Sequence, residues 1–353
     1  MAPPEYHIEH VILLVIFLVF ASVGTSFAQA SPATTPPTAR WLDLQTLSVN
    51  IRHRRIVTST GTVGKNQAQE KTQIRARFKI DPAARYAVHV GAFSGDGFTS
   101  SWNATGLGTG DFTGVHLVKQ LFLAARPVAG LELQYGGLYV EKGESSEITY
   151  YDEDGYLVGE RVFVRRPDWF FFNEIMATLG SRGDLDDSNV FNRFESLDRT
   201  DYRQVQLTRQ FGDAATASFD YTWVDDASTI RPAVTLQTPW TPALDQVRLE
   251  IYHRYGEDPA SGFALDGSRN IGRVRVTGGY ADIDPAVGEF NGDRYGEGRR
   301  LYIGASIPVV AGLNLSLFGT HTVGETAPLP NKIRTDVVLT YSFLPALRRT
   351  GLF

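Results

Sequence analysis

The sequence predicts an all-β fold: a transmembrane, antiparallel, up-and-down β-barrel of about fourteen strands, with twelve and sixteen strands as the alternatives. Two observations carry this prediction. Segments of roughly ten residues in which apolar and polar side chains alternate recur along the chain, and the connections between them take turns in being short and long. Alternation with a period of two is typical of strands that have one apolar face and one polar face.

The composition excludes several other classes of protein. The chain has 353 residues and no cysteine, so it contains neither a disulfide scaffold nor a thiolate metal site. With 34 basic and 39 acidic side chains, the formal net charge is −5. A nucleic-acid partner would require a concentrated basic surface, and this near-neutral balance gives no sign of one.

The N-terminal residues predict export. Residues 11–21 are an uninterrupted apolar run of the length found in signal-peptide cores, and Ala28-Gln29-Ala30 is an A-x-A cleavage site. We therefore expect a signal peptide at 1–30, although its first ten residues lack Lys and Arg; a single-span anchor is the alternative reading. Residues 31–43 are expected to form a Pro/Thr-rich periplasmic linker.

The strands of the barrel are expected between residues 44 and 343. The clearest is 70–80, where Ile74 and Phe78 share one face and Arg75 and Arg77 share the other. The weakest are 114–125, where Lys119 and Gln120 disturb both faces and predict a bulge, and 260–267. The fourteen expected strands are 44–57, 70–80, 85–94, 114–125, 130–140, 202–211, 215–224, 229–238, 245–255, 260–267, 271–282, 299–308, 312–321 and 333–343.

Loop lengths separate a transmembrane barrel from a soluble sandwich. Short connections are expected at 81–85, 126–130, 211–214 and 308–312, and long ones at 58–69, 95–112, 283–298 and 322–332. Short turns on one rim and long loops on the other are what membrane barrels show. An even number of strands also places both ends of the barrel on the periplasmic side, with residues 344–353 as a C-terminal tail.

These features resemble the Gram-negative outer-membrane porin-type barrels. The resemblance rests on the signal peptide, on the rhythm of strands and loops, and on the last strand, with Val337, Leu339, Tyr341 and Phe343 on one face. No diagnostic motif supports it. One departure is the stretch LPALRRTGLF after Phe343, so that Phe353 is an alternative carrier of the C-terminal assembly signal.

The cost of placing a charge in lipid predicts whether the charged side chains of the strands point into the barrel or out of it. A cation on the lipid face costs about 2 to 4 kcal/mol at mid-bilayer, so the charged residues of the strands should line the pore. The expected pore-lining basic residues are Arg52, Arg54, Arg75, Arg77, Lys79, Arg231, Arg248, Arg254, Arg273, Arg275, Arg300 and Arg334, and the acidic ones are Glu132, Asp220, Glu250 and Asp336. Twelve cations against four anions predict a lumen that attracts anions.

The connection 141–201 is expected to be one long acidic loop. It holds fifteen acidic and seven basic residues and an apolar stretch at 169–179. This stretch is apolar enough to be a strand, but adding it alone would make the number of strands odd. Because porin-type barrels fold one long loop into the lumen, the resemblance implies a constriction element here; a solvated external flap is the alternative. Asp152, Asp154 and Glu160 are weak candidates for a calcium site.

The expected function is passive diffusion of small, preferably anionic solutes across the outer membrane. A structural barrel filled by its own loop or by a periplasmic partner, and a conduit for an acidic polysaccharide, are the alternatives. We expect no enzymatic activity and no cofactor, because the histidines are scattered and neither G-x-S-x-G nor H-E-x-x-H occurs. The expected partners are membrane lipid, small solutes and, by analogy with porins, further copies of the chain.

Overall fold

The computed structural model describes residues 41–58, 60–94, 116–144, 156–169, 171–182, 189–224, 226–239, 241, 243–256, 258–284, 298–323 and 333–349. The expected signal peptide and most of the linker lie outside these ranges. The last two residues expected in the linker belong to the first strand, which begins at Leu42. Among the described residues, no helix combines the length and the apolar character needed to span a membrane.

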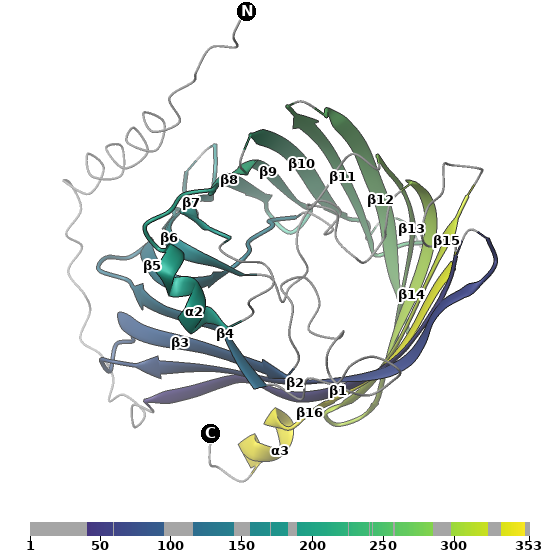
Figure 1. Ribbon diagram of the computed structural model, residues 1–353, viewed down its shortest axis with the longest axis horizontal. Coiled ribbons are helices and arrows are strands. Elements are labelled where there is room, and N and C mark those ends of the chain that lie inside the picture. The colour runs from purple at the N-terminus through teal and green to yellow at the C-terminus, as the bar shows by residue number, and fades with distance from the viewer. Residues whose placement is uncertain are drawn as a thin grey trace, which may run out of the picture. The chain divides into compact units, whose positions relative to one another are not determined.

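The described strands form one closed antiparallel barrel, in which each strand pairs with its neighbours in the chain and the last strand pairs with the first (Figure 1). The strands are β1 (Leu42–Val57), β2 (Val63–Lys79), β3 (Tyr86–Ser94), β4 (His116–Ala125), β5 (Leu131–Tyr139), β6 (Tyr156–Arg165), β7 (Glu174–Ser181), β8 (Tyr202–Phe211), β9 (Ala215–Val224), β10 (Ala227–Gln237), β11 (Gln246–Tyr255), β12 (Ala260–Ile271), β13 (Val274–Ile283), β14 (Gly298–Val310), β15 (Leu313–Thr322) and β16 (Ile333–Ser342).

The fold class is confirmed, and the barrel has sixteen strands instead of fourteen. The two additional strands are β6 and β7, and both lie inside the segment 141–201 that was expected to be one loop. The expectation failed because apolar residues occur on both faces of these strands, and because 169–179 taken alone would have made the number of strands odd. In β6, Leu157 and Val158 are adjacent and both fully buried, so the polarity does not alternate.

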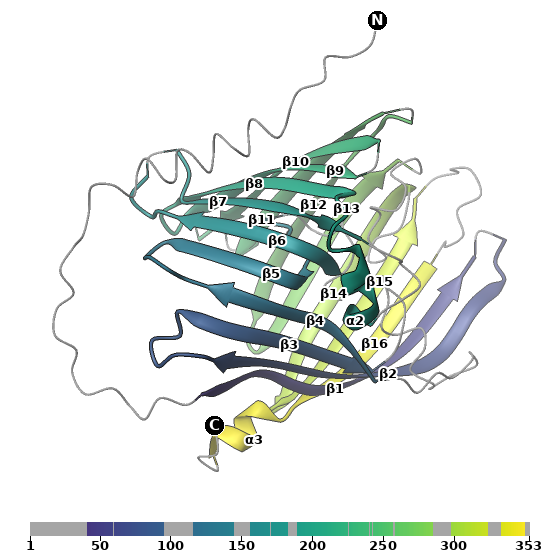
Figure 2. The same cartoon turned by 60° about the vertical axis from the view of Figure 1, so that its left-hand side comes forward.

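The two rims of the barrel differ in the length of their connections, as expected (Figure 2). One rim is the rim at which β1 begins and β16 ends, and its connections are tight turns. Gly212, Gly272 and Gly312 lie in three of these turns and have a positive φ, which glycine tolerates best. We call this rim the short-turn rim. On the opposite rim the β1–β2 connection is only 58–62, because β2 begins seven residues before the expected start at residue 70.

The strands separate an apolar outer face from a polar inner face. Ile74 and Phe78 are 41% and 46% exposed on the outside of β2, whereas Lys71 and Gln73 on the other face are buried. Lipid would cover the exposed apolar residues in a membrane. The energetic argument for the direction of the charges therefore holds for this strand.

The bulge expected in 114–125 is confirmed. Gly91 of β3 pairs with Gln120, but the next residue of β3, Ala92, pairs with Val118, so that Lys119 is the extra residue. Both Lys119 and Gln120 are buried as a result. A bulge allows two successive side chains of a strand to avoid the lipid face.

The connection between β7 and β8 returns over the outer wall. It contains the single-turn helix α2 (Val190–Arg193) and a 3₁₀ turn at Phe194–Ser196. Val190 is fully buried and packs with Val158, Val118 and Leu121. Leu121 lies on the same face of β4 as the exposed Leu123, so this contact is on the outside of the barrel.

The chain continues beyond the last strand into the short helix α3 (Leu344–Arg349), which occupies most of the expected tail 344–353. The ring of Phe343 packs edge-on against that of Tyr341, with centroids 4.8 Å apart, and its N–H donates to the Leu47 carbonyl at 2.9 Å. Phe343 therefore belongs to the wall, as expected. Phe353 lies outside the described residues.

Candidate functional site

A short segment that follows β5 runs along the inner wall of the barrel. Glu141 accepts a hydrogen bond through its carbonyl oxygen from Gln204 Nε2 at 2.8 Å, and the Glu144 N–H donates to Ser218 Oγ at 2.9 Å. Gln204 lies on β8 and Ser218 on β9, and both side chains are buried on the inward face. We call residues 140–144 the inner segment.

Arg161 on β6 holds the beginning of the inner segment. Its guanidinium donates to the carbonyl oxygen of Tyr139 and lies 3.6 Å from the Glu141 carboxylate, while its Nε donates to Thr178 Oγ1 at 2.9 Å. Arg161 is itself buried. Arg161 was expected to lie in the long loop 141–201, so it was not among the expected pore-lining residues. Its inward position follows once β6 is recognised as a strand.

The expected constriction loop 141–201 is therefore wrong as a single element. Its first four residues do lie against the inner wall, but the next described residues form β6 and β7, and the remainder contains α2 on the outer wall. Within the apolar stretch 169–179, residues 174–179 belong to β7, a strand of the wall and not part of a plug.

A group of the expected pore-lining residues is buried behind the inner segment. Arg231 donates hydrogen bonds to Asp220 and Thr222, and its side chain and that of Asp220 are 0% and 1% exposed. Gln204 bridges this pair to the inner segment, since its Nε2 also donates to Asp220 at 2.5 Å. Elsewhere on the inner wall, Glu250 on β11 and Arg300 on β14 are also fully buried. These four side chains point inward as expected, but solvent does not reach them.

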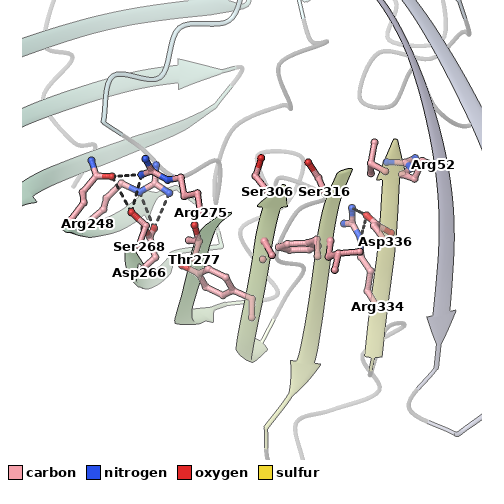
Figure 3. Close-up of a pocket in the computed structure, with 17 residues that line it drawn as sticks. Arg52, Arg248, Asp266, Ser268, Arg275, Thr277, Ser306, Ser316, Arg334 and Asp336 are labelled. Carbon is pink, nitrogen blue, oxygen red and sulfur yellow. Dashed lines mark hydrogen bonds and ion pairs between the residues drawn. The ribbon is translucent and has the colours of Figure 1, made fainter. Parts of the chain in front are cut away.

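The opposite part of the inner wall contains a cavity of about 390 Å³, which lies against β11 to β16 and β1. Figure 3 shows two groups of charged residues in it, separated by Ser306 and Ser316. The charged residues that line it are Arg52, Arg248, Arg275, Arg334, Asp266 and Asp336. Four arginines and two aspartates give this cavity a formal charge of +2.

Both aspartates of the cavity are paired with arginine. Asp336 accepts hydrogen bonds from Arg54 at 2.9 Å and from Arg334 at 2.6 Å, and Asp266 accepts from Arg248 at 2.8 Å. Asp266 was missed in the sequence, because its strand was one of the two weakest predictions and its inward face was not counted. The count of twelve cations to four anions therefore left out Asp266, and it also left out the inward cations Lys71, Lys119 and Arg161.

Arg275 differs from the other arginines of the cavity. Its guanidinium NH2 donates to two neutral acceptors, Gln246 Oε1 at 2.7 Å and Ser268 Oγ at 2.8 Å. No carboxylate within the described ranges lies within 4 Å of it, and the residue is exposed to the cavity. Its positive charge is therefore available to a mobile anion.

The remaining expected residues lie around the lumen. Arg52 donates to Gln69 Oε1 at 2.7 Å, and Arg77 forms an ion pair with Asp43 at 2.6 Å. The guanidinium of Arg75 stacks on the rings of Phe93 and Tyr139, at 5.4 and 4.8 Å from their centroids. Each of these cations therefore has a partner that fixes its position.

The last group lies close to the rims. Glu132 accepts from Arg126 at 2.9 Å and from Arg165 at 3.0 Å near the short-turn rim, where Lys79 ends β2. Arg254 is half-buried near the opposite rim. Arg273 lies in the turn between β12 and β13 and is exposed, so its assignment to a strand was wrong.

The candidate calcium ligands are not assembled by the described residues. Glu160 lies on β6 opposite Tyr135 and is exposed on the outer face, whereas Asp152 and Asp154 lie outside the described residues. Among the described residues no group of three or more potential ligands is close enough to hold a metal ion.

The closed sixteen-stranded antiparallel barrel is similar in fold to solved structures of bacterial porins. The solved structure of OmpF from Salmonella typhi in complex with daunomycin matches with a TM-score of 0.56 at 12% identity, over 86% of this chain and 97% of that one. A variant of Rhodopseudomonas blastica porin matches with a TM-score of 0.56 at 12% identity, over 86% of this chain and 100% of that one.

These similarities confirm the resemblance to porins at the level of the fold. No protein-family model and no curated protein sequence matches the chain.

Proposed function

We propose that this protein is an outer-membrane channel for the passive diffusion of small, preferably anionic solutes, exported by the signal peptide at 1–30. The cavity of net charge +2 on the inner wall carries the proposal, and Arg275 in particular, because its charge faces the cavity without a carboxylate partner. The porin fold supports the same function.

The physical basis is electrostatic. A positive charge inside a wall of low dielectric constant raises the local concentration of anions and lowers that of cations. The inner segment lies on another part of the wall, against β8 and β9. Such a channel uses no catalytic group and no cofactor, and assembly into homo-oligomers remains part of the proposal.

The full chain, exported in a Gram-negative host and purified from its outer membrane, should form ion-conducting pores in a planar lipid bilayer. Under a gradient of potassium chloride, the reversal potential should show a preference for chloride, and that preference should weaken at about 1 M salt, where the Debye length is about 3 Å. A cation-selective pore would contradict the anionic preference. A correctly folded barrel without conductance would favour the filled, structural barrel.

A further inference from the structure

The register of the strands places an ordered row of side chains across the floor of the cavity. Arg275 on β13 is directly opposite Ser306 on β14, which is opposite Ser316 on β15. The row continues through Val338 on β16 to Arg52 on β1. Arginines therefore stand at both ends, roughly 19 Å apart at the usual spacing of strands, with small hydroxyl side chains beside Arg275.

The two serines are oriented by a third residue. Ser306 Oγ lies 3.1 Å from Asn314 Oδ1, to which it can only donate, and Asn314 Nδ2 donates to Ser316 Oγ at 2.9 Å. Within the described ranges, this leaves the lone pairs of Ser306 as acceptors and the hydroxyl hydrogen of Ser316 as a donor. A hydroxyl group of a solute can donate to the first serine and accept from the second.

The anionic group of such a solute would have its place beside the serines. Residues directly opposite on neighbouring strands have Cβ atoms about 5 Å apart, so Arg275 and Ser306 reach the same small molecule. Arg275 is held in the cavity by Gln246 and Ser268, which leave its charge uncompensated. Its other guanidinium N–H groups remain available for a carboxylate or a phosphate.

From this arrangement we propose that the cavity is a saturable binding site for a small polyhydroxylated anion, such as a sugar acid or a sugar phosphate. The anionic group contacts Arg275, and hydroxyl groups contact Ser306 and Ser316. A cavity of about 390 Å³ lies near the lower end of the range found for ligand sites, about 300 to 1,000 Å³, which suits one sugar unit. The inference rests on the proposed channel function, since solutes reach the site through the lumen.

The first test compares solutes on single channels. Potassium gluconate and glucose 6-phosphate should interrupt the current in a concentration-dependent, saturable manner, whereas uncharged glucose should not. The anion with the lower half-blocking concentration, gluconate or glucose 6-phosphate, shows whether the site prefers a carboxylate or a phosphate. Arg275→Gln should raise the half-blocking concentration of both anions by about tenfold or more, because it removes a charged hydrogen-bond donor.

Arg348→Gln is the matched control, since it removes an equal charge from α3, where the side chain is exposed outside the cavity. It should leave the half-blocking concentrations unchanged. An equal effect of both substitutions would overturn the assignment of the site to this cavity.

The second test separates recognition of hydroxyl groups from general attraction of anions. The double variant Ser306→Ala with Ser316→Ala keeps every charge, so its reversal potential in potassium chloride should equal that of the wild type. Its half-blocking concentration for gluconate should rise about threefold to tenfold, as expected for lost neutral hydrogen bonds. An unchanged concentration would overturn the proposal of a polyhydroxylated ligand.

Failure of the channel proposal would be distinguishable from failure of the site. If the barrel folds but does not conduct, titration calorimetry of the detergent-solubilised protein with gluconate and with glucose 6-phosphate still measures binding. Binding that Arg275→Gln weakens would support the site in a closed barrel. No heat of binding to the wild type would overturn it.

Discussion

Gly143 of the inner segment lies so close to Ser218 of β9 that a β-carbon added at position 143 would stand 2.8 Å from the Ser218 hydroxyl oxygen. Gly143 also has a φ of +54°, in the left-handed region where glycine is favoured. The path of the inner segment across the wall therefore depends on the absence of a side chain at this residue.

Gly143→Ala should displace the inner segment and change the single-channel conductance, while the barrel itself stays folded. Gly212→Ala is the matched control, because Gly212 has a φ of +57° but no atom within 4 Å of the added carbon. The control should keep the wild-type conductance. Heat-dependent migration in SDS gels checks that both variants fold.

Ser218→Gly should also displace the inner segment, since it removes the hydroxyl oxygen that accepts a hydrogen bond from the Glu144 N–H. If Gly143→Ala conducted like the wild type, the inner segment would lie outside the path of the ions.

Asp220→Ala should destabilise the barrel without altering its ion selectivity. The substitution leaves the Arg231 charge buried and without its carboxylate partner, which typically costs about 3 to 5 kcal/mol. The free energy of unfolding can be measured by urea titration in detergent or lipid vesicles. A marked shift of the reversal potential would instead show that solvent reaches the Asp220 and Arg231 pair.

Asp266→Asn should change the ion selectivity and have a smaller effect on stability. It removes one of the two negative charges of the cavity and releases Arg248 from its ion pair, so that the preference for chloride should increase. The stability should change less than in Asp220→Ala, because Arg248 is partly exposed to the cavity. The reversal potential under a salt gradient measures the first effect, and a shift toward cations would contradict it.

Val190→Ala should loosen α2 from the outer wall. Two buried methyl groups are lost, which corresponds to about 2 kcal/mol of local stability. The connection between β7 and β8 should then be cleaved faster in limited proteolysis. Phe191→Ala, at the neighbouring exposed residue, serves as the control and should have little effect on the rate. Equal rates for both variants and the wild type would show that Val190 does not anchor α2.

The alternation of apolar and polar residues was sufficient to predict a strand where one of its faces meets lipid and the other meets the polar interior. Ile74 and Phe78 face outward and Arg75 and Arg77 face inward on β2, because a charge in lipid costs far more than any local preference of the chain. The same energetic contrast made the barrel class predictable. It also made the bulge at Lys119 predictable, since neither face of a regular strand would have suited the two polar residues there.

The pattern disappears where protein covers both faces of the wall. The α2 helix covers Val158 on the outer face, and a buried cluster that includes Tyr202 covers Leu157 on the inner face, so both positions can be apolar. β6 therefore lacks alternation, and the sequence offered no local signal that would separate it from a loop. The number of strands was decided by these tertiary contacts.

The sequence by itself determined the architecture and the direction of the charged side chains, because both follow from the free energy of placing single residues in lipid or in a polar interior. Only the tertiary structure decided which charges a solute can meet. Arg231 and Arg275 both point inward, yet the first is paired with Asp220 and buried, and the second faces a cavity. The difference arises from contacts between residues far apart in the chain, such as Gln204 with Glu141, which no local pattern encodes.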